Sequence, residues 1–280
     1  MRNIEYMNGI AGVAVGGVAT LNFQTERRYH GIKVFPSAMI ESDPIGAPGV
    51  YDQATTDPTE IIEYAKLIVN GVVIRDLTPE DAIKLVQANY GGVAVDNHIP
   101  FQFSGPTRAS ITGEEATSWD MWGQRTFVME LKFKSNIANP TVLTLASYDY
   151  GRNLVNGKPF LNIVKQLSYT YNAPAGNYDI VSLPKANPIQ RIHIEPSSGT
   201  VSEATVTRDA EKVFEATKVQ NDEFHKDYGI DSPYGYSIVF DHEQQLTSPL
   251  VVKRDLNVRP TFSASNSAKV IVESISRGYA

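Results

Sequence analysis

The feature of the sequence that most constrains its fold is a pattern of β-prone runs, a turn and a helix start that occurs twice. In the first copy, residues 67–69 and 72–74 are β-prone and are joined by Asn70-Gly71. An Asn-Gly pair between two such runs is typical of a β-hairpin. Thr78-Pro79 follows and predicts a helix, with Thr78 as N-cap and proline at the first helical position.

The predicted helix places Ile83, Val86 and Tyr90 on one face and ends at Tyr90-Gly91, where glycine can adopt the left-handed cap conformation. Beyond a short loop, apolar side chains alternate at Ile99, Phe101 and Phe103. Alternation of this kind predicts a β-strand with one buried face.

A similar series of features occurs in the second half of the chain. Residues 205–207 and 212–214 are β-prone around a turn at 208–210, and Asn221-Asp222 predicts a helix cap. The remaining landmarks of the second copy are Phe224 and Tyr228 on one helix face, the stop at Tyr228-Gly229, alternation at Tyr236, Ile238 and Phe240, and Thr261-Phe262 as the counterpart of Thr126-Phe127. Hairpins and Tyr-Gly pairs also recur by chance in strand-rich chains, but the shared order favours one module used twice.

Composition agrees with a β-rich globular chain. Of 280 residues, 42% are apolar and 20% are charged, which is typical of a protein with a sizeable core. Twenty glycines, sixteen prolines, fourteen tyrosines and eleven phenylalanines favour many short strands joined by turns. The predicted strands are 18–23, 30–35, 118–122, 127–133 and 142–148 in the first half, and 163–171, 178–183, 189–194, 246–252, 258–264 and 270–275 in the second.

This spacing of strands, with one short helix per set, predicts an all-β fold of two eight-stranded antiparallel jelly-roll sandwiches side by side, a double jelly roll. The predicted organisation is a flexible N-terminal arm at 1–17, a first jelly roll at 18–150, a linker at 151–160 and a second jelly roll at 161–280. Residues 40–60 and 104–115 are predicted to be surface loops without an assigned role.

Charge and cysteine content restrict the function classes. The net charge of −6 provides no basic surplus, so we expect no direct binding to nucleic acid. The absence of cysteine indicates folding in a reducing cytoplasm, without disulfides or thiol chemistry. Residues 9–21 are the nearest approach to a signal or membrane segment, but glycines interrupt them, so an arm is preferred to a signal peptide.

The sequence contains none of the usual catalytic signatures. It has no G-x-S-x-G elbow, no H-E-x-x-H pair and no paired cysteine motif. Residues 151–159 resemble a phosphate-binding loop but miss its spacing and end in proline, and residues 12–17 lack the spacing of a dinucleotide fingerprint. We therefore predict no enzymatic activity, no catalytic residues and no cofactor-binding residues.

The sequence leaves open whether the chain has a metal-binding site or a pair of catalytic carboxylates. Five histidines (His30, His98, His193, His225 and His242) show no ligand spacing on one element and are expected in the core or on the surface. Glu114-Glu115, Asp231 and Asp241 could pair as in a glycosidase, although solvated loops explain them better. The carboxylates that could hold a structural Ca²⁺ are Asp43, Asp52 and Asp57 in one loop, or Asp227 and Asp231 around Tyr228-Gly229.

Taken together, the chain resembles the major capsid proteins of corticovirus-type bacteriophages, which are tailless and icosahedral and have an internal membrane. The resemblance covers most of the chain through short motifs. These are Met1-Arg2-Asn3 leading to residues 10–14, the hairpin and helix at 67–90, residues 152–167, 179–185 and 191–194, Asn221-Asp222, Tyr228-Gly229, and the end at 276–279. Residues 40–60 and 104–115 have no counterpart in it.

The resemblance implies a coat protein that forms homotrimers of hexagonal outline, which tile a shell over a lipid membrane. It also implies neighbouring capsomers, minor capsid proteins and membrane proteins as partners, and lipid headgroups near the N-terminal arm. Location in the virion after folding in the host bacterial cytoplasm follows from the same resemblance. The alternatives are a two-domain glycan-binding module or glycan hydrolase, and a trimeric receptor-binding spike.

Overall fold

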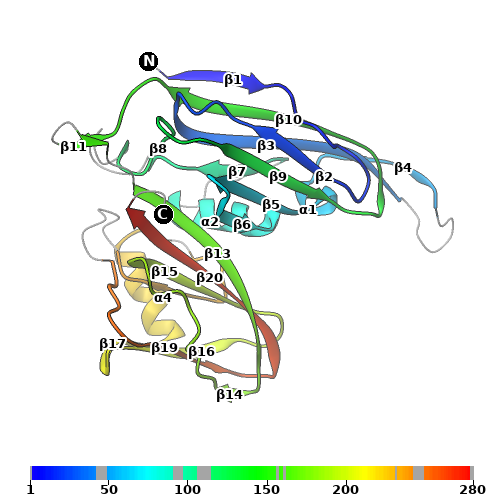
Figure 1. Ribbon diagram of the computed structural model, residues 1–280. Coiled ribbons are helices and arrows are strands. Elements are labelled where there is room, and N and C mark those ends of the chain that lie inside the picture. Colours follow the sequence, from blue (N-terminus) through cyan, green and yellow to red (C-terminus); the bar gives the residue numbers. More distant parts are fainter. Residues whose placement is uncertain are drawn as a thin grey trace. The chain divides into compact units, whose positions relative to one another are not determined.

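The computed structural model describes residues 2–41, 49–90, 97–105, 115–155, 158–159, 162–230, 232–241 and 249–277. The chain divides into two compact units (Figure 1). Unit 1 comprises Met1–Val86, Val93–Ile163 and Arg277–Ala280, and unit 2 comprises Gln87–Gly92 and Val164–Ser276. The predicted loop at 104–115 and the middle of the predicted loop at 40–60 lie largely outside the described residues.

Unit 1 is an antiparallel β-sandwich. Its first sheet contains β1 (Asn3–Met7), β10 (Ile137–Asp149), β3 (Arg28–Glu41) and β4 (Tyr51–Thr55) in this order, with β7 (Ile99–Gln102) and β8 (Trp119–Asp120) also pairing with β3. In its second sheet, the neighbours are β2 (Val18–Asn22), β9 (Phe127–Phe133), β5 (Ile62–Val69) and β6 (Val72–Leu77). The short helix α1 (Pro58–Ile61) precedes β5, and α2 (Pro79–Tyr90) follows β6.

Period-2 alternation explains the core of unit 1. In β9, the side chains of Phe127, Met129, Leu131 and Phe133 are buried while the intervening ones are half-buried, as the sequence predicts. Phe127 stacks on Phe23 with ring centroids 4.7 Å apart. Aromatic packing of this kind adds to the area that each ring buries and stabilises the contact between strands.

Unit 2 repeats this architecture. One sheet contains β13 (Asn162–Ala173), β20 (Asn266–Arg277), β15 (Ile189–Pro196) and β18 (Tyr236–Val239) in this order. The other contains β14 (Gly176–Asn177), β19 (Leu256–Phe262), β16 (Val201–Arg208) and β17 (Glu211–Thr217). Helix α4 (Lys218–Asp227) connects β17 to β18.

The strand order is the same in both units, so the prediction of one module used twice is confirmed. β1, β10, β3 and β7 correspond to β13, β20, β15 and β18, and β2, β9, β5 and β6 correspond to β14, β19, β16 and β17. A helix joins the last strand of one sheet to the last strand of the other in each unit. The fold is therefore two antiparallel jelly-roll sandwiches on one chain.

The two hairpin turns agree in detail. Asn70 and Gly71 have φ values of 51° and 79°, and Asp209 and Ala210 have 50° and 68°, so both turns use two left-handed residues. The Asn70 side-chain oxygen accepts hydrogen bonds from two backbone N–H groups just before β9, and the Asp209 carboxylate accepts three just before β19. In each unit, one turn residue thus fastens its hairpin to the segment that leads into the neighbouring strand.

The helices confirm the predicted ends better than the predicted faces. Thr78 accepts a hydrogen bond from the Asp81 N–H, as predicted, and Gly229 follows α4 with a φ of 64°. The predicted cap at Asn221-Asp222 is wrong, because Thr217 caps α4 through a capping box with Gln220. The predicted face of α2 is also wrong, since Ile83 and Val86 are only half-buried. The buried residues of α2 are Pro79, Asp81, Ala82, Leu85 and Ala88.

The prediction of a flexible N-terminal arm at 1–17 is wrong for residues 3–7, which form β1. Residues 3–7 pair with β10, and Figure 1 shows β1 lying along that strand. The Glu5 carboxylate accepts hydrogen bonds from Arg27 and from the Tyr148 hydroxyl, which fastens β1 to the sandwich. Backbone pairing with β10 orders this segment despite its glycine-rich continuation.

Other predicted elements also change. The loop at 40–60 contains β4, and the linker at 151–160 contains the small hairpin of β11 (Leu154–Val155) and β12 (Lys158–Pro159). The strand predicted at 178–183 is reduced to a single bridge from Ile180 to Val258, and residues 249–252 show only a bridge from Leu250 to Ile189. Thr126-Phe127 begins β9 whereas Thr261-Phe262 ends β19, so this pair of landmarks is not equivalent.

Candidate functional site

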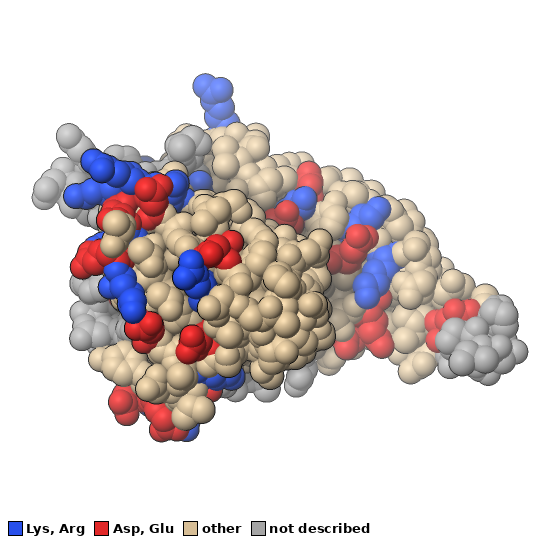
Figure 2. All heavy atoms as spheres, turned by 90° about the horizontal axis from the view of Figure 1, so that it is seen from below, with Lys and Arg blue, Asp and Glu red and all other residues tan. Residues whose placement is uncertain are grey.

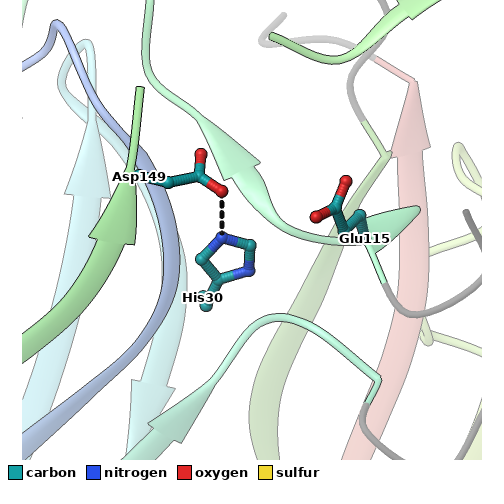
Figure 3. Close-up of side chains that lie close together, drawn as sticks. All are labelled: His30, Glu115 and Asp149. Atoms are coloured by element: carbon teal, nitrogen blue, oxygen red, sulfur yellow. Dashed lines mark hydrogen bonds and ion pairs between the residues drawn. The ribbon is translucent and has the colours of Figure 1, made fainter. Parts of the chain in front are cut away.

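In unit 1, a cluster of charged side chains lies between β3 and β10. Arg28 faces Asp149 across the two strands and donates two hydrogen bonds to its carboxylate, of 2.9 Å from Nε and 2.7 Å from Nη2. His30, two residues along β3, has its Nε2 at 3.0 Å from the same carboxylate (Figure 3). Burial alone would raise the pKa of Asp149, but the hydrogen bonds from Arg28, His30 and the Gly151 N–H outweigh burial and lower it well below its ordinary value.

Glu115 completes a group that has the composition of a metal site. Ligand atoms of His30, Glu115 and Asp149 lie within 4.8 Å of one another. The Arg28 guanidinium already joins the two carboxylates, since its Nη1 donates a 3.0 Å hydrogen bond to Glu115. A divalent cation at this position would lie against a permanent positive charge. The residues present therefore fit an arginine-centred ion-pair cluster and do not fit a metal ion.

The ring of His30 is held in one form. Because an ionised carboxylate only accepts hydrogen bonds, Nε2 carries the proton that points to Asp149. Burial, the largest cause, lowers the pKa of His30 despite the nearby carboxylate, so the ring is neutral at pH 7. Its Nδ1 has no hydrogen-bond partner among the described residues.

A depression of about 210 Å³ opens on the same sheet of unit 1. Its lining includes His30, the cations Arg2 and Lys33, and the apolar side chains of Ile4 and Leu145. No carboxylate or paired nucleophile is found among the lining residues that the structure describes. The depression consequently offers positive charge and apolar surface beside the ring of His30.

Unit 2 contains a hydrogen-bonded series that resembles a catalytic triad. Ser232 donates to the Ser237 hydroxyl at 2.6 Å, and Ser237 lies 2.7 Å from His193 Nδ1. His193 Nε2 lies 2.9 Å from Glu273, whose other oxygen accepts a 2.7 Å hydrogen bond from Gln166. Burial would raise the pKa of Glu273, but His193, the charge of Arg191 and Gln166 lower it to about 2.

This series is closed to substrates. Ser237 and Glu273 are each 2% exposed and His193 is 1% exposed, and the ring of Tyr234 lies over His193 at 4.5 Å between centroids. A serine nucleophile must reach a substrate carbonyl, which this burial prevents. The series is therefore a structural network that satisfies buried polar groups.

The structure describes only some of the site residues considered from the sequence. Asp43, Glu114, Asp231 and His242 lie outside the described residues. Asp57 is the N-cap of α1 and accepts from the Thr59 N–H, while Asp52 is exposed on β4. Asp241 is buried and accepts a hydrogen bond from Gln190. Each suggested calcium cluster and the carboxylate pair include residues outside the described ones, so these sites stay predictions.

Sequence reasoning missed the two charged networks, although a signal for them is visible. Arg28-Tyr29-His30 on β3 and Arg191-Ile192-His193 on β15 are the same Arg-x-His pattern on equivalent strands. Each arginine is paired across the sheet with an acid, Asp149 in unit 1 and Glu273 in unit 2. Comparing the two halves for recurring polar residues, rather than for turns alone, would have found the pattern.

Comparisons with known proteins assign the chain to a family. The model of the viral coat protein P2 N-terminal domain matches residues 50–149, and that of the viral coat protein P2 C-terminal domain matches residues 163–278. The chain belongs to the viral coat protein P2 family. This is a family of structural capsid proteins and not of enzymes, in agreement with the prediction from the sequence.

Solved capsid proteins share the fold over the whole chain. The major capsid protein P2 from bacteriophage PM2 is similar with a TM-score of 0.82 at 17% identity, covering 100% of this chain and 98% of that one. The major capsid protein of Sulfolobus turreted icosahedral virus has a TM-score of 0.69 at 10% identity, with coverages of 100% and 98%. The Faustovirus major capsid protein has a TM-score of 0.64 at 7% identity, covering 99% of this chain and 90% of that one. No curated protein sequence matches the chain.

The family membership confirms the predicted resemblance and the predicted class of function. The protein is a viral major capsid protein with a double jelly-roll fold, located in the virion capsid. The function of such a protein lies in the contacts between its surfaces and other capsid components. The two buried networks are then elements of the scaffold that holds those surfaces.

Proposed function

We propose that the chain assembles into homotrimers of pseudo-hexagonal outline that tile an icosahedral shell over an internal lipid membrane. The single observation that carries this proposal is the repetition of one strand order in two units of the same chain. Three copies present six modules of similar shape, which suits packing in a hexagonal lattice. The residue boundaries 18–150 and 161–280 for the two jelly rolls belong to the same proposal.

Neighbouring capsomers are the first partners, followed by minor capsid proteins and membrane proteins. Lipid headgroups are a further partner, and the cations Arg2 and Lys33 around the depression in unit 1 support contact with an anionic surface there. Direct contact with nucleic acid is not expected, because the net charge is −6. On the face drawn in Figure 2, basic and acidic side chains are interspersed rather than gathered by sign.

Folding takes place in the host bacterial cytoplasm before assembly. The absence of cysteine supports this, since the fold needs no oxidising compartment. Among the described residues, no helix is both long and apolar enough to cross a bilayer.

Light scattering on the purified protein tests the trimer. We expect a particle of three times the chain mass of 30.8 kDa, and electron microscopy should show hexagonal capsomers. A stable monomer with affinity for glycans would contradict the proposal and favour the glycan-binding alternative. A high copy number in purified particles would separate a coat protein from a receptor-binding spike.

Flotation with vesicles tests the lipid contact. The wild-type protein should float with vesicles containing anionic lipid and stay behind with purely zwitterionic ones. Replacing Arg2 and Lys33 together by Gln should abolish flotation, whereas Lys253→Gln, an exposed lysine of unit 2, should leave it unchanged. If the Arg2 and Lys33 double variant floated as well as Lys253→Gln, the proposed contact with lipid headgroups would be wrong.

A further inference from the structure

A β-bulge in β3 turns two consecutive residues toward the same side of the first sheet of unit 1. Tyr29 and Ile32 are 0% and 1% exposed and belong to the core. Between them, the pairing of β3 with β10 shifts by one residue. His30 and Gly31 therefore both lie toward the outer face of the sheet. Bulges of this kind often lie next to functional sites, because they change the direction in which a side chain points.

Small side chains form the floor of the depression on this outer face. Gly31 lies opposite Ser147 on β10 and opposite Gln102 on β7. Ser147 in turn lies opposite Ile4 on β1, which completes a row across four strands. The next row carries larger side chains, which are Tyr6, Leu145, Lys33 and Pro100. The difference in size between the two rows leaves a hollow of about 210 Å³, which at ~30 Å³ per molecule is the liquid volume of about seven waters.

The charge of the depression favours an anion. Its lining carries the cations Arg2 and Lys33 and no carboxylate among the residues that the structure describes. Glu5, the acid of β1, points to the opposite side because side chains alternate along a strand, and it accepts two hydrogen bonds there. The carboxylate of Asp149 is already bound by Arg28. Positive charge in the hollow is therefore available to a negatively charged ligand.

The ring of His30 adds a hydrogen-bond acceptor to the site. His30 lines the depression and is 2% exposed. Its Nε2 donates to Asp149, and Figure 3 shows the other ring nitrogen turned away from that carboxylate. This Nδ1 is an acceptor in the neutral ring and has no hydrogen-bond partner among the described residues. A buried acceptor without a partner is unfavourable, so a ligand that donates a hydroxyl hydrogen to it gains affinity.

We propose that this depression is a binding site for a phosphodiester anion that also carries a hydroxyl, which is the chemistry of a phosphoglycerol group. The phosphate lies between Arg2 and Lys33, since both side chains bind phosphate oxygens. The hydroxyl lies at the floor, where it donates to His30 Nδ1 and accepts from the Ser147 hydroxyl. The site rests on the proposed lipid contact and narrows it from attraction to any anionic surface to recognition of one chemical group.

Two anionic lipids that differ only in the hydroxyls of the headgroup test the selectivity. Phosphatidylglycerol and phosphatidylmethanol carry the same phosphodiester charge, but only the first has headgroup hydroxyls. The wild-type protein should bind vesicles of phosphatidylglycerol about fivefold more tightly, which is the effect of one added hydrogen bond. Equal binding to both lipids would overturn recognition of the hydroxyl on a membrane and would leave the proposed lipid contact intact.

Ser147→Leu tests whether the depression itself is the site, because leucine fills the floor and leaves both cations in place. The matched control is Thr141→Leu, an exposed position on the same face of β10. Ser147→Leu should reduce binding to phosphatidylglycerol to the level of phosphatidylmethanol, whereas Thr141→Leu should keep the wild-type preference. If Ser147→Leu does not keep the thermal midpoint of the wild type, Ser147→Ala replaces it and should lose part of the preference. A folded Ser147 variant with the full preference would overturn the site.

Calorimetry with soluble compounds separates a lipid headgroup from a free ligand. Glycerophosphoglycerol, the deacylated headgroup, should bind the wild-type protein more tightly than dimethyl phosphate, which has no hydroxyl. If Ser147→Leu removes this binding and phosphatidylglycerol vesicles do not bind, the site stands with a free ligand and the proposed lipid contact is wrong. A preference seen with vesicles alone assigns the ligand to the membrane surface. If neither vesicles nor soluble compounds show an effect of the hydroxyl, the site is overturned.

Discussion

The two jelly rolls contain the same Arg-x-His strand pattern but compensate its burial differently. In unit 1, Arg28 donates two hydrogen bonds to Asp149 and one to Glu115, so its positive charge is compensated by two direct carboxylate contacts. In unit 2, Arg191 donates to Asn89, which the division of the chain places in the same unit, and Glu273 accepts from Gln166 and His193.

The second ring nitrogen of the histidine shows the same difference. His193 Nδ1 is hydrogen-bonded to Ser237, whereas His30 Nδ1 has no partner among the described residues and His30 lines a depression. One pattern thus gives a closed network in unit 2 and a network beside a surface depression in unit 1. Duplication preserves the cross-strand charges, while the neighbouring segments decide how accessible they are.

The largest loss of stability is expected for Glu273→Gln. It removes the buried carboxylate that is hydrogen-bonded to His193 and Gln166 and lies in the field of the Arg191 charge, which should cost roughly 3–5 kcal/mol of unfolding free energy. Urea unfolding followed by far-UV circular dichroism measures this, with the exposed Glu215→Gln as control. A loss below about 1 kcal/mol would show that neutral donors alone hold the unit 2 network.

Lowering the pH of the wild-type protein should cause a large part of the same loss of unfolding free energy. The folded pKa of Glu273 is about 2, below its ordinary value of 4.5, so the unfolded chain binds the proton more readily. The stability from this group is therefore complete above about pH 4.5 and is lost as the pH falls toward 2. Urea midpoints measured between pH 6 and pH 2.5 should drop in the wild type and change less in Glu273→Gln.

A smaller effect is expected for Asp149→Asn in unit 1. Arg28 keeps Glu115 and Asn153 as partners, so we expect a loss of about 2 kcal/mol. Both tryptophans, Trp119 and Trp122, lie in unit 1, so tryptophan fluorescence reports this unit separately. A loss equal to that of Glu273→Gln would remove the distinction between the two networks.

The smallest effects concern the two hairpin turns. Asn70→Gly and Asp209→Gly keep the left-handed backbone but remove the side-chain hydrogen bonds, and each should lower the Tm by about 2–4 °C. The Ala variants should lower it further, because alanine resists positive φ. If the Gly and Ala variants had the same Tm, the side-chain hydrogen bonds of Asn70 and Asp209, and not the backbone conformation, would stabilise the turns.

Sequence alone was sufficient for the parts of this protein that depend on local chemistry. Alternation in β9, the left-handed Asn70-Gly71 turn and the Thr78 cap each follow from neighbouring residues, and all three are present. The repeated order of such local signals was enough to predict two jelly rolls and, with the resemblance, a coat protein.

Tertiary structure decided what depends on residues distant in the chain. Asn3–Met7 is a strand only because β10 provides a partner, and α2 buries Leu85 rather than Val86 because packing selects the face. Arg28 and Asp149 are 121 positions apart, and no local spacing brings them together. Backbone pairing between strands places such charges in contact, so the two networks became visible only in the folded chain.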